Sequence, residues 1–196
     1  SVISNDDIAI FGNIIEKRTL LWAIKNRIVC DYKIQTLITN NEQLEQLLTK
    51  FSITTTANKQ LFLAAFAALK SITCGESHHL LIYSNSIPNA AIINKYITEL
   101  LDACYFAYPG CIYNACYNST DYSARESQAI LSTFESASAG IICCVYCLGE
   151  GWDFPILDGV VFAEAMTSNI RIVQSALRAS RKNAAEPNKV AKIILP

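Results

Sequence analysis

From residue 79 onward, short apolar runs alternate with longer segments in which hydrophobic positions recur every three or four residues. The apolar runs have the length and composition of buried strands: 79–84, 111–116, 140–147, 159–164 and 189–195. The longer segments have the period of a helix with one apolar face: 89–103, 122–136 and 170–183. Strands that are apolar on both faces and separated by helices indicate a mostly parallel sheet with helices on both sides. The pattern therefore predicts a doubly wound, three-layer α/β/α domain.

The first 75 residues are less regular. Their hydrophobic pattern predicts helices at 18–26, 41–50 and 57–72, and an extended segment at 30–38 that joins the same sheet. The 196 residues include only 7 glycines and 5 prolines, which argues against a flexible linker inside the chain. We expect a single domain over residues 1–196, with 1–75 as its N-terminal part and 76–196 as its core.

Composition narrows the classes of function. Hydrophobic residues make up 52% of the chain, enough for a substantial core, and the formal net charge of −1 gives no general attraction to polyanions. Any contact with nucleic acid must therefore come from a local patch. No apolar stretch reaches the roughly 18 residues of a membrane helix, and we recognise no secretory leader. We expect an intracellular protein, in the cytoplasm or nucleus, without a membrane partner.

Cysteine and histidine do not form a metal-binding pattern. Most of the 8 cysteines stand within apolar runs, which predicts reduced thiols packed in a core: Cys30, Cys104, Cys111, Cys116, Cys143, Cys144 and Cys147. Cys144 and Cys147 have CxxC spacing, but structural zinc needs four converging ligands and no second pair lies nearby. His78 and His79 are adjacent, and neighbouring side chains of a strand point to opposite faces. We predict no metal site.

The segment "IRIVQSALRASRKN", residues 170–183, carries most of the chemistry in the sequence. On a helix at about 100° per residue, Gln174, Arg178 and Arg181 fall within about 60° of one another, and Arg171 extends the row by one turn. One interpretation is a solvated basic face. The other is an anion clamp, because guanidinium groups make bidentate contacts with phosphate. The positions expected to face the sheet are Val173, Ala176, Leu177 and Ser180.

"QSALRASR" resembles motif six of the superfamily-two helicases and translocases, written Q-x-x-G-R-x-x-R, with Leu177 at the glycine position. The resemblance implies that Gln174, Arg178 and Arg181 face ATP held by a neighbouring lobe. Arg181 would be the finger that stabilises charge on the transferred phosphoryl group. The leucine side chain, unlike glycine, limits how closely the backbone can approach a partner at that position.

A second segment, "LGEGWDFPILDGVVF" (148–162), resembles motif five of the same superfamily. The glycines permit a tight turn with exposed backbone N–H groups, and Asp153 can accept hydrogen bonds from a ribose hydroxyl. The resemblance implies that Glu150, Gly151 and Asp153 face the nucleotide and that Gly149 faces nucleic acid. A glycine-rich loop after a strand is common in α/β domains, so this loop alone does not indicate motif five. The arginine segment that follows it strengthens the resemblance.

A third segment, "LLIYSNSIPNA" (80–90), resembles motif four. Ser84, Asn85 and Ser86 would cap the next helix, and the N–H groups there suit a nucleic-acid phosphate, although capping alone also explains these residues. The stretch 10–34 is similar to the passage that links the two lobes in this superfamily. "SNIRIVQSALRASRKN" and "KVAKIILP" are like the helicases of large DNA viruses, which would add a viral replication site or virion to the expected locations.

The sequence has no G-x-x-x-x-G-K-[ST] phosphate loop and no strand ending in an Asp-Glu pair. The resemblance therefore implies the second RecA-like lobe alone, with ATP and Mg²⁺ held mainly by an N-terminal RecA-like lobe and the backbone of DNA or RNA gripped across both. We expect the isolated domain to be inactive. A Rossmann-type methyltransferase or dehydrogenase would need a G-x-G-x-x-G turn, which is absent. A non-catalytic RecA-like module that binds nucleic acid or protein remains an open alternative.

Overall fold

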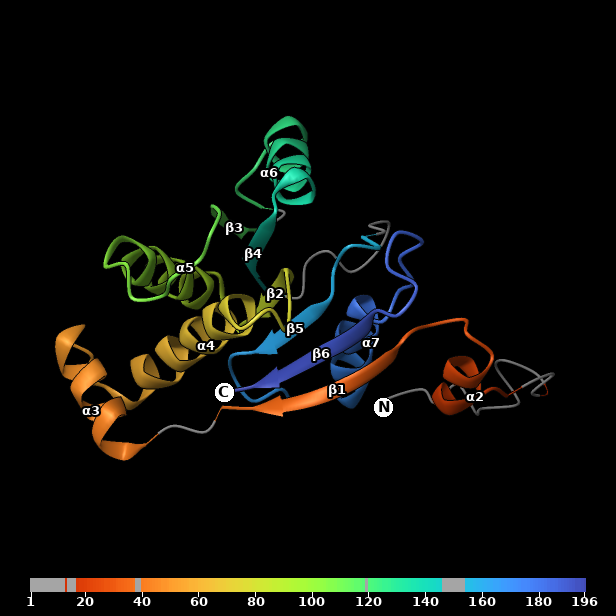
Figure 1. Cartoon of the computed structure of the whole chain (residues 1–196), viewed down its shortest axis with the longest axis horizontal. Coiled ribbons are helices and arrows are strands. Elements are labelled where there is room, and N and C mark those ends of the chain that lie inside the picture. The colour runs from red at the N-terminus through yellow and green to blue at the C-terminus, as the bar shows by residue number, and fades with distance from the viewer. Residues whose placement is uncertain (1–12, 14–16, 38–39, 119, 146–153) are drawn as a thin grey trace.

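A parallel sheet forms the centre of the molecule in the computed structural model, which describes residues 13, 17–37, 40–118, 120–145 and 154–196. Its six strands lie in the order β1-β6-β5-β2-β4-β3, and every neighbouring pair is parallel (Figure 1). The strands are β1 (Asp31–Thr36), β2 (His79–Tyr83), β3 (Ile112–Tyr117), β4 (Ala139–Cys144), β5 (Gly159–Phe162) and β6 (Val190–Leu195). The predicted doubly wound α/β class is confirmed, and β1 joins the same sheet as expected.

Helices cover both faces of the sheet. They are α2 (Leu20–Lys25), α3 (Asn41–Lys50), α4 (Thr56–Thr73), α5 (Ile87–Asp102), α6 (Ala124–Ser136) and α7 (Asn169–Ala179). Alternate residues of β2 enter two separate cores: Leu80 and Ile82 pack with α4 and α5, whereas Leu81 and Tyr83 pack with side chains of α6 and α7. The three-layer arrangement therefore follows from strands that are apolar on both faces.

The helix starts follow the local chemistry of the sequence. Thr55 caps α4, Ser86 caps α5 with a proline in its first turn, and Ser123 forms a capping box with Glu126 at the start of α6. Gly140 of β4 has no room for a side chain, since a Cβ there would lie 2.6 Å from Phe134 of α6. These local features fix where each helix begins and how closely α6 approaches the sheet.

The β1 end of the sheet is much less covered than its middle. β2, β4 and β5 are buried along their whole length, whereas β1 is almost entirely exposed. Ile34 of β1 is 62% exposed and Leu21 of α2 is 59% exposed. An apolar groove of about 280 Å³ runs between α7 and this end of the sheet, lined in part by Leu20, Tyr32 and Leu177.

The cysteines divide between core and surface. Cys143 and Cys144 are fully buried in β4, as predicted, and every described cysteine is a free thiol. Cys104 and Cys111 are exposed, so the core prediction is wrong for them. They lie in the connection between α5 and β3, where the apolar pattern of the sequence continues past the end of the helix. Cys147 lies outside the described residues.

Among the described residues, no helix is both long and apolar enough to cross a membrane.

Candidate nucleotide-facing site

The arginine helix α7 is fixed to the sheet by small side chains. Ser168 caps its N-terminus by accepting a hydrogen bond from the Arg171 N–H, at 3.4 Å. Ser175 and Ala179 are buried against β5 and β6. Short side chains on this face let the helix backbone lie close to the strands. The opposite face is therefore turned outward along the whole helix.

The predicted orientation of α7 is correct for the polar row and wrong for one apolar position. Gln174 and Arg171 are exposed and Arg178 is half-buried, so all three lie away from the core. Val173, which we expected to face the sheet, is 51% exposed. The face that packs on the sheet is centred on Ser175 and Ala179, because those smaller residues allow the closer approach.

Arg181 is not part of α7, which corrects the prediction of a continuous helical row. The helix ends at Ala179, and Ser180 is its C-cap with φ −83° and ψ 3°. The Ser180 carbonyl accepts the Cys30 N–H at 2.8 Å, which ties the helix end to the start of β1. The Arg181 N–H contacts the Arg178 carbonyl at 3.4 Å, so one further turn brings Arg181 to the surface. Both arginines therefore lie at the same end of α7.

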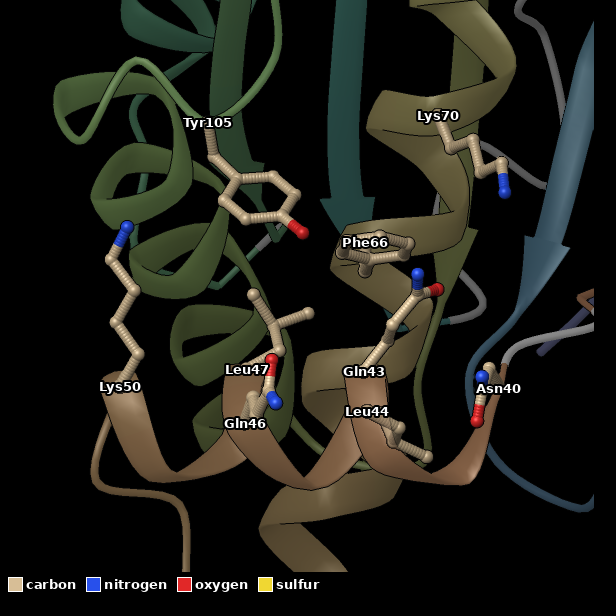
Figure 2. A pocket seen from close by; sticks show the side chains of 9 residues that line it. All are labelled: Asn40, Gln43, Leu44, Gln46, Leu47, Lys50, Phe66, Lys70 and Tyr105. Atoms are coloured by element: carbon tan, nitrogen blue, oxygen red, sulfur yellow. The ribbon is translucent and has the colours of Figure 1, made fainter.

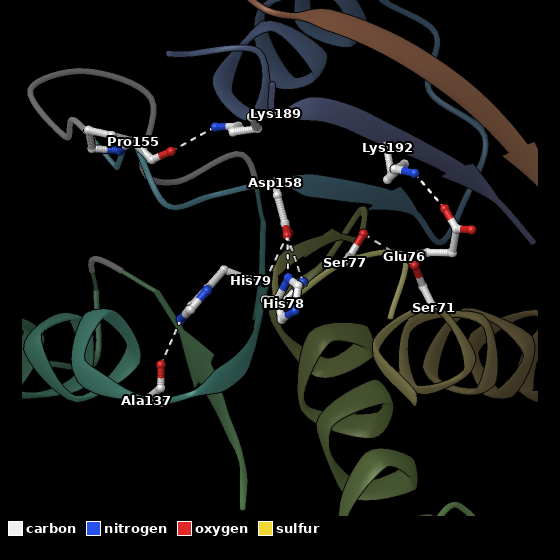
Figure 3. A network of polar contacts seen from close by, with 10 residues as sticks. All are labelled: Ser71, Glu76, Ser77, His78, His79, Ala137, Pro155, Asp158, Lys189 and Lys192. Atoms are coloured by element: carbon white, nitrogen blue, oxygen red, sulfur yellow. Dashed lines mark hydrogen bonds and ion pairs between the residues drawn. The ribbon is translucent and has the colours of Figure 1, made fainter. Parts of the chain in front are cut away.

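This end of α7 lies at the amino edge of the sheet, where β1, β5 and β6 begin. Lys189, directly before β6, is 4% exposed. Its Nζ donates to the Pro155 carbonyl at 2.7 Å and to the Arg181 carbonyl at 2.6 Å (Figure 3 shows the Pro155 contact). Burial lowers the pKa of the Lys189 ammonium, and Cys30 and nearby carboxylates oppose this shift. Lys189 was not among the residues predicted from the sequence. The feature that could have indicated it is a lysine directly before an apolar strand.

A second polar cluster fixes the start of β5 and β2 at the same edge. The Asp158 carboxylate accepts the N–H groups of His78 and His79 at 2.7 and 2.9 Å (Figure 3). His79 is buried, with its Nε2 3.1 Å from the Ala137 carbonyl oxygen, and burial lowers the pKa of its imidazole. Lys192 of β6 forms an ion pair with Glu76. Among the described residues, no group of three or more His, Cys, Asp or Glu side chains could hold a metal ion.

The residues of the motif-four segment lie at the opposite, carboxyl edge. A strand of five residues is about 16 Å long, so this segment and the arginines are far apart. The Asn85 N–H, which we expected to be available to phosphate, donates to the Glu164 carboxylate at 2.8 Å. The Ser84 hydroxyl donates to the Ser86 carbonyl, and the Ser86 hydroxyl accepts the Asn89 N–H. These contacts favour the capping interpretation, and phosphate binding here stays a prediction.

The motif-five segment is described only in its second half. Gly149, Glu150, Gly151 and Asp153 lie outside the described residues. Phe154 and Leu157, which follow, are 7% and 2% exposed and are joined by a 3.1 Å backbone hydrogen bond. The chain that leaves this loop is therefore anchored in the core shared by α6 and α7.

The structure also has a cavity of about 400 Å³ that plays no part in this arrangement. It lies between α3, α4 and the residue Tyr105 that follows α5, with Lys50, Phe66 and Lys70 in its wall (Figure 2). α4 and α5 cover the face of the sheet opposite α7. The arginines cannot reach this cavity.

Known structures share the fold of all or most of this chain. The ATP-dependent Type ISP restriction-modification enzyme LlaBIII, solved bound to DNA, superposes on 98% of this chain with a TM-score of 0.75 and 18% identity. A putative HsdR subunit of a type I restriction enzyme from Vibrio vulnificus YJ016 covers 100% of this chain, with a TM-score of 0.66 and 16% identity. Domain 2 of the DEAD-box helicase Mss116p, bound to an RNA duplex, covers 71%, with a TM-score of 0.53 and 12% identity.

The chain has the fold of the C-terminal RecA-like lobe of superfamily-two helicases. The chain spans 14% of the LlaBIII chain, 38% of the HsdR chain and 50% of the Mss116p chain. No protein-family model and no curated protein matches its sequence. The resemblance to viral helicases finds no support among these neighbours.

Proposed function

We propose that this chain is the second lobe of an ATP-dependent superfamily-two helicase or translocase, and that it supplies Arg178 and Arg181 to ATP held by an N-terminal lobe. The observation that carries this proposal is the end of α7. Ser175 and Ala179 of α7 are buried, Arg178 is half-buried, and Arg181, two residues past the helix, is exposed. The Lys189 ammonium binds the carbonyls of both Arg181 and Pro155. Pro155 is two residues after Asp153, which the motif-five resemblance assigns to the ribose.

The chemistry of phosphoryl transfer suits this arrangement. Negative charge spreads over the oxygens of the transferred group, so catalysis depends on positioning and on cationic groups placed around it. Arg178 and Arg181 can each make bidentate contacts with phosphate oxygens. Gln174, one turn earlier, adds a neutral hydrogen-bonding group to the same row. Because α7 is packed on the sheet, these groups arrive already oriented when the two lobes close.

ATP and its Mg²⁺ would be held mainly by the other lobe. Among the described residues of this lobe there is no cluster of metal ligands. When bound, Mg²⁺ neutralises charge on the phosphates. The part left to this lobe is to supply cationic side chains after closure and, at Asp153, an acceptor for the ribose.

Nucleic acid would lie across both lobes and be gripped through its backbone, with little sequence preference. We assign residues 84–86 and Gly149 to this contact in the present lobe. The contact requires the segment to present donors that Glu164 and the helix cap do not already occupy.

The test is Arg181→Ala in the complete polypeptide, assayed for nucleic-acid-stimulated hydrolysis and, separately, for ATP binding. Loss of an arginine finger costs about a thousandfold or more in turnover, so kcat should fall by that amount while the Kd for ATP is unchanged. Lys182→Ala is the matched control, since it removes the next exposed cation. Turnover near the wild-type value would contradict the proposal, and an equal loss of hydrolysis and binding would place Arg181 in ground-state binding instead.

A further inference from the structure

Lys189 is a buried cation whose hydrogen bonds both go to main-chain carbonyls. Lysine is almost never fully buried unless its ammonium has partners. Here the partners are Pro155, 34 residues earlier, and Arg181, 8 residues earlier. The distances of 2.7 and 2.6 Å place the two carbonyl oxygens at most 5.3 Å apart, the sum of the two. Lys189 therefore joins the arginine segment to the chain that leaves the motif-five loop.

Each of the two joined segments is also anchored on its other side. The arginine segment is held to β1 by the hydrogen bond from Cys30 to the Ser180 carbonyl. The Pro155 segment continues to Asp158, whose carboxylate accepts the N–H groups of His78 and His79. Lys189 thus connects two parts of the amino edge that are otherwise fixed to different strands.

The sequence neighbours of these contacts are the groups that the proposed function uses. The carbonyl that Lys189 binds belongs to Arg181 itself, and Pro155 follows Asp153 by two residues. A shift of about 1 Å in a positioning group can cost about a hundredfold in rate. On the basis of the function proposed above, we propose that Lys189 is a positioning residue, which sets the place of the Arg181 finger relative to the Pro155 segment.

The experiment replaces Lys189 with methionine in the complete polypeptide. Methionine keeps an unbranched apolar chain but cannot donate to either carbonyl. We expect kcat for nucleic-acid-stimulated ATP hydrolysis to fall about 10- to 100-fold, with the KM for ATP changed less than about threefold. Lys192→Met is the matched control: it removes the other buried lysine of this edge, whose ion pair with Glu76 does not involve the arginine segment. It should lower Tm without lowering kcat.

A double-mutant cycle shows whether Lys189 acts through Arg181. If it does, adding Lys189→Met to Arg181→Ala should cause little further loss of kcat, since the finger is already gone. If Lys189→Met lowers kcat by the same factor in the Arg181→Ala protein as in the wild type, the inference is wrong. Wild-type turnover in a folded Lys189→Met protein would overturn it as well. If Arg181→Ala alone leaves kcat unchanged, the proposed function itself is wrong. If Arg181→Ala lowers kcat and Lys189→Met does not, only the role of Lys189 is wrong.

A second variant covers the case in which the methionine protein does not fold. In Lys189→Gln the side chain is uncharged and one bond shorter than that of lysine. The glutamine amide can therefore donate to at most one of the two carbonyls, and no charge is left buried. This variant should fold and show the same fall in kcat. A folded Lys189→Gln protein with the wild-type rate and an unchanged KM would refute the positioning role.

Discussion

Polar groups at the amino edge of the sheet, where the strands begin, make different contacts from those at the carboxyl edge, where the strands end. At the amino edge, buried groups such as Lys189 and Asp158 bind main-chain atoms and hold separate segments together, while Arg178 and Arg181 are left half-buried or exposed beside them. At the carboxyl edge, Glu164 accepts the Asn85 N–H and the Asn89 side-chain amide, 2.8 and 2.9 Å away. The amino edge therefore places two arginines beside segments that buried polar groups hold together, and the carboxyl edge places a carboxylate against two of its donors.

This difference indicates where each kind of ligand can bind. A triphosphate needs several cations in fixed positions, and the amino edge offers them on a packed helix end. A nucleic-acid phosphate at the carboxyl edge has to compete with a carboxylate that already occupies the best-placed donor. We expect substitutions at the amino edge to act on turnover and substitutions at the carboxyl edge to act, more weakly, on nucleic-acid affinity.

Gln174→Ala tests the middle of the arginine row. Gln174 is an exposed residue on α7, so its loss should leave the fold unchanged. One neutral hydrogen bond is worth about 1 to 1.5 kcal/mol, which corresponds to a fall in kcat/KM of about tenfold. The measurement is steady-state ATP hydrolysis by the complete polypeptide. Gln128→Ala, which removes an exposed glutamine from α6, is the control, and equal effects of the two changes would argue against a special role for the row.

Glu164→Gln tests the carboxyl edge. The single amide oxygen of glutamine can still accept the Asn85 N–H, while the Asn89 amide loses its acceptor and the negative charge next to the expected phosphate path is gone. We expect nucleic-acid affinity to rise about threefold at low salt and the gain to shrink as salt is added, as for other partly exposed charges. Glu186→Gln, at an exposed position of the amino edge, should have no effect in the same binding assay. Unchanged or weaker binding in Glu164→Gln would remove residues 84–86 from the nucleic-acid path.

His79 gives the smallest expected effect, a change in the pH dependence of stability. Burial lowers the pKa of this imidazole below its ordinary 6.5, so the unfolded chain binds more protons than the folded one in the window just below pH 6.5. The free energy of unfolding should therefore fall as pH decreases through that window, by at most about 1.4 kcal/mol per pH unit for one group. Urea unfolding at several pH values should show a flatter profile for His79→Gln, and an unchanged profile would contradict the assignment.

The elements of the fold could be predicted from the sequence because each rests on short-range pattern. The period of the apolar positions located α5 and α6, and the alternation of runs indicated the parallel sheet. Residues that depend on distant partners could not be placed this way. Ser180, the C-cap of α7, accepts a hydrogen bond from Cys30, 150 residues away, and the local pattern of the sequence did not show that Arg181 lies beyond the helix.

The same reason explains what was missed at the two edges. Lys189 binds carbonyl oxygens, which every residue has, so no residue type in the sequence marks its partners. Glu164 and Asn85 are 79 residues apart, and only the neighbouring positions of β2 and β5 bring them together. The placement of Gln174 and Arg178 on the outer side of α7 was visible in advance because it depends on local spacing, whereas the placement of Arg181 was not.

The most direct test of the central claim compares how the complete polypeptide binds ATP and a transition-state analogue, ADP with aluminium fluoride. An arginine that acts on the transferred group binds the transition state more strongly than the ground state. We predict that Arg181→Ala keeps the wild-type affinity for ATP but loses about a thousandfold in its preference for the analogue. The same preference in wild type and Arg181→Ala would contradict the claim that this end of α7 faces the reacting phosphate.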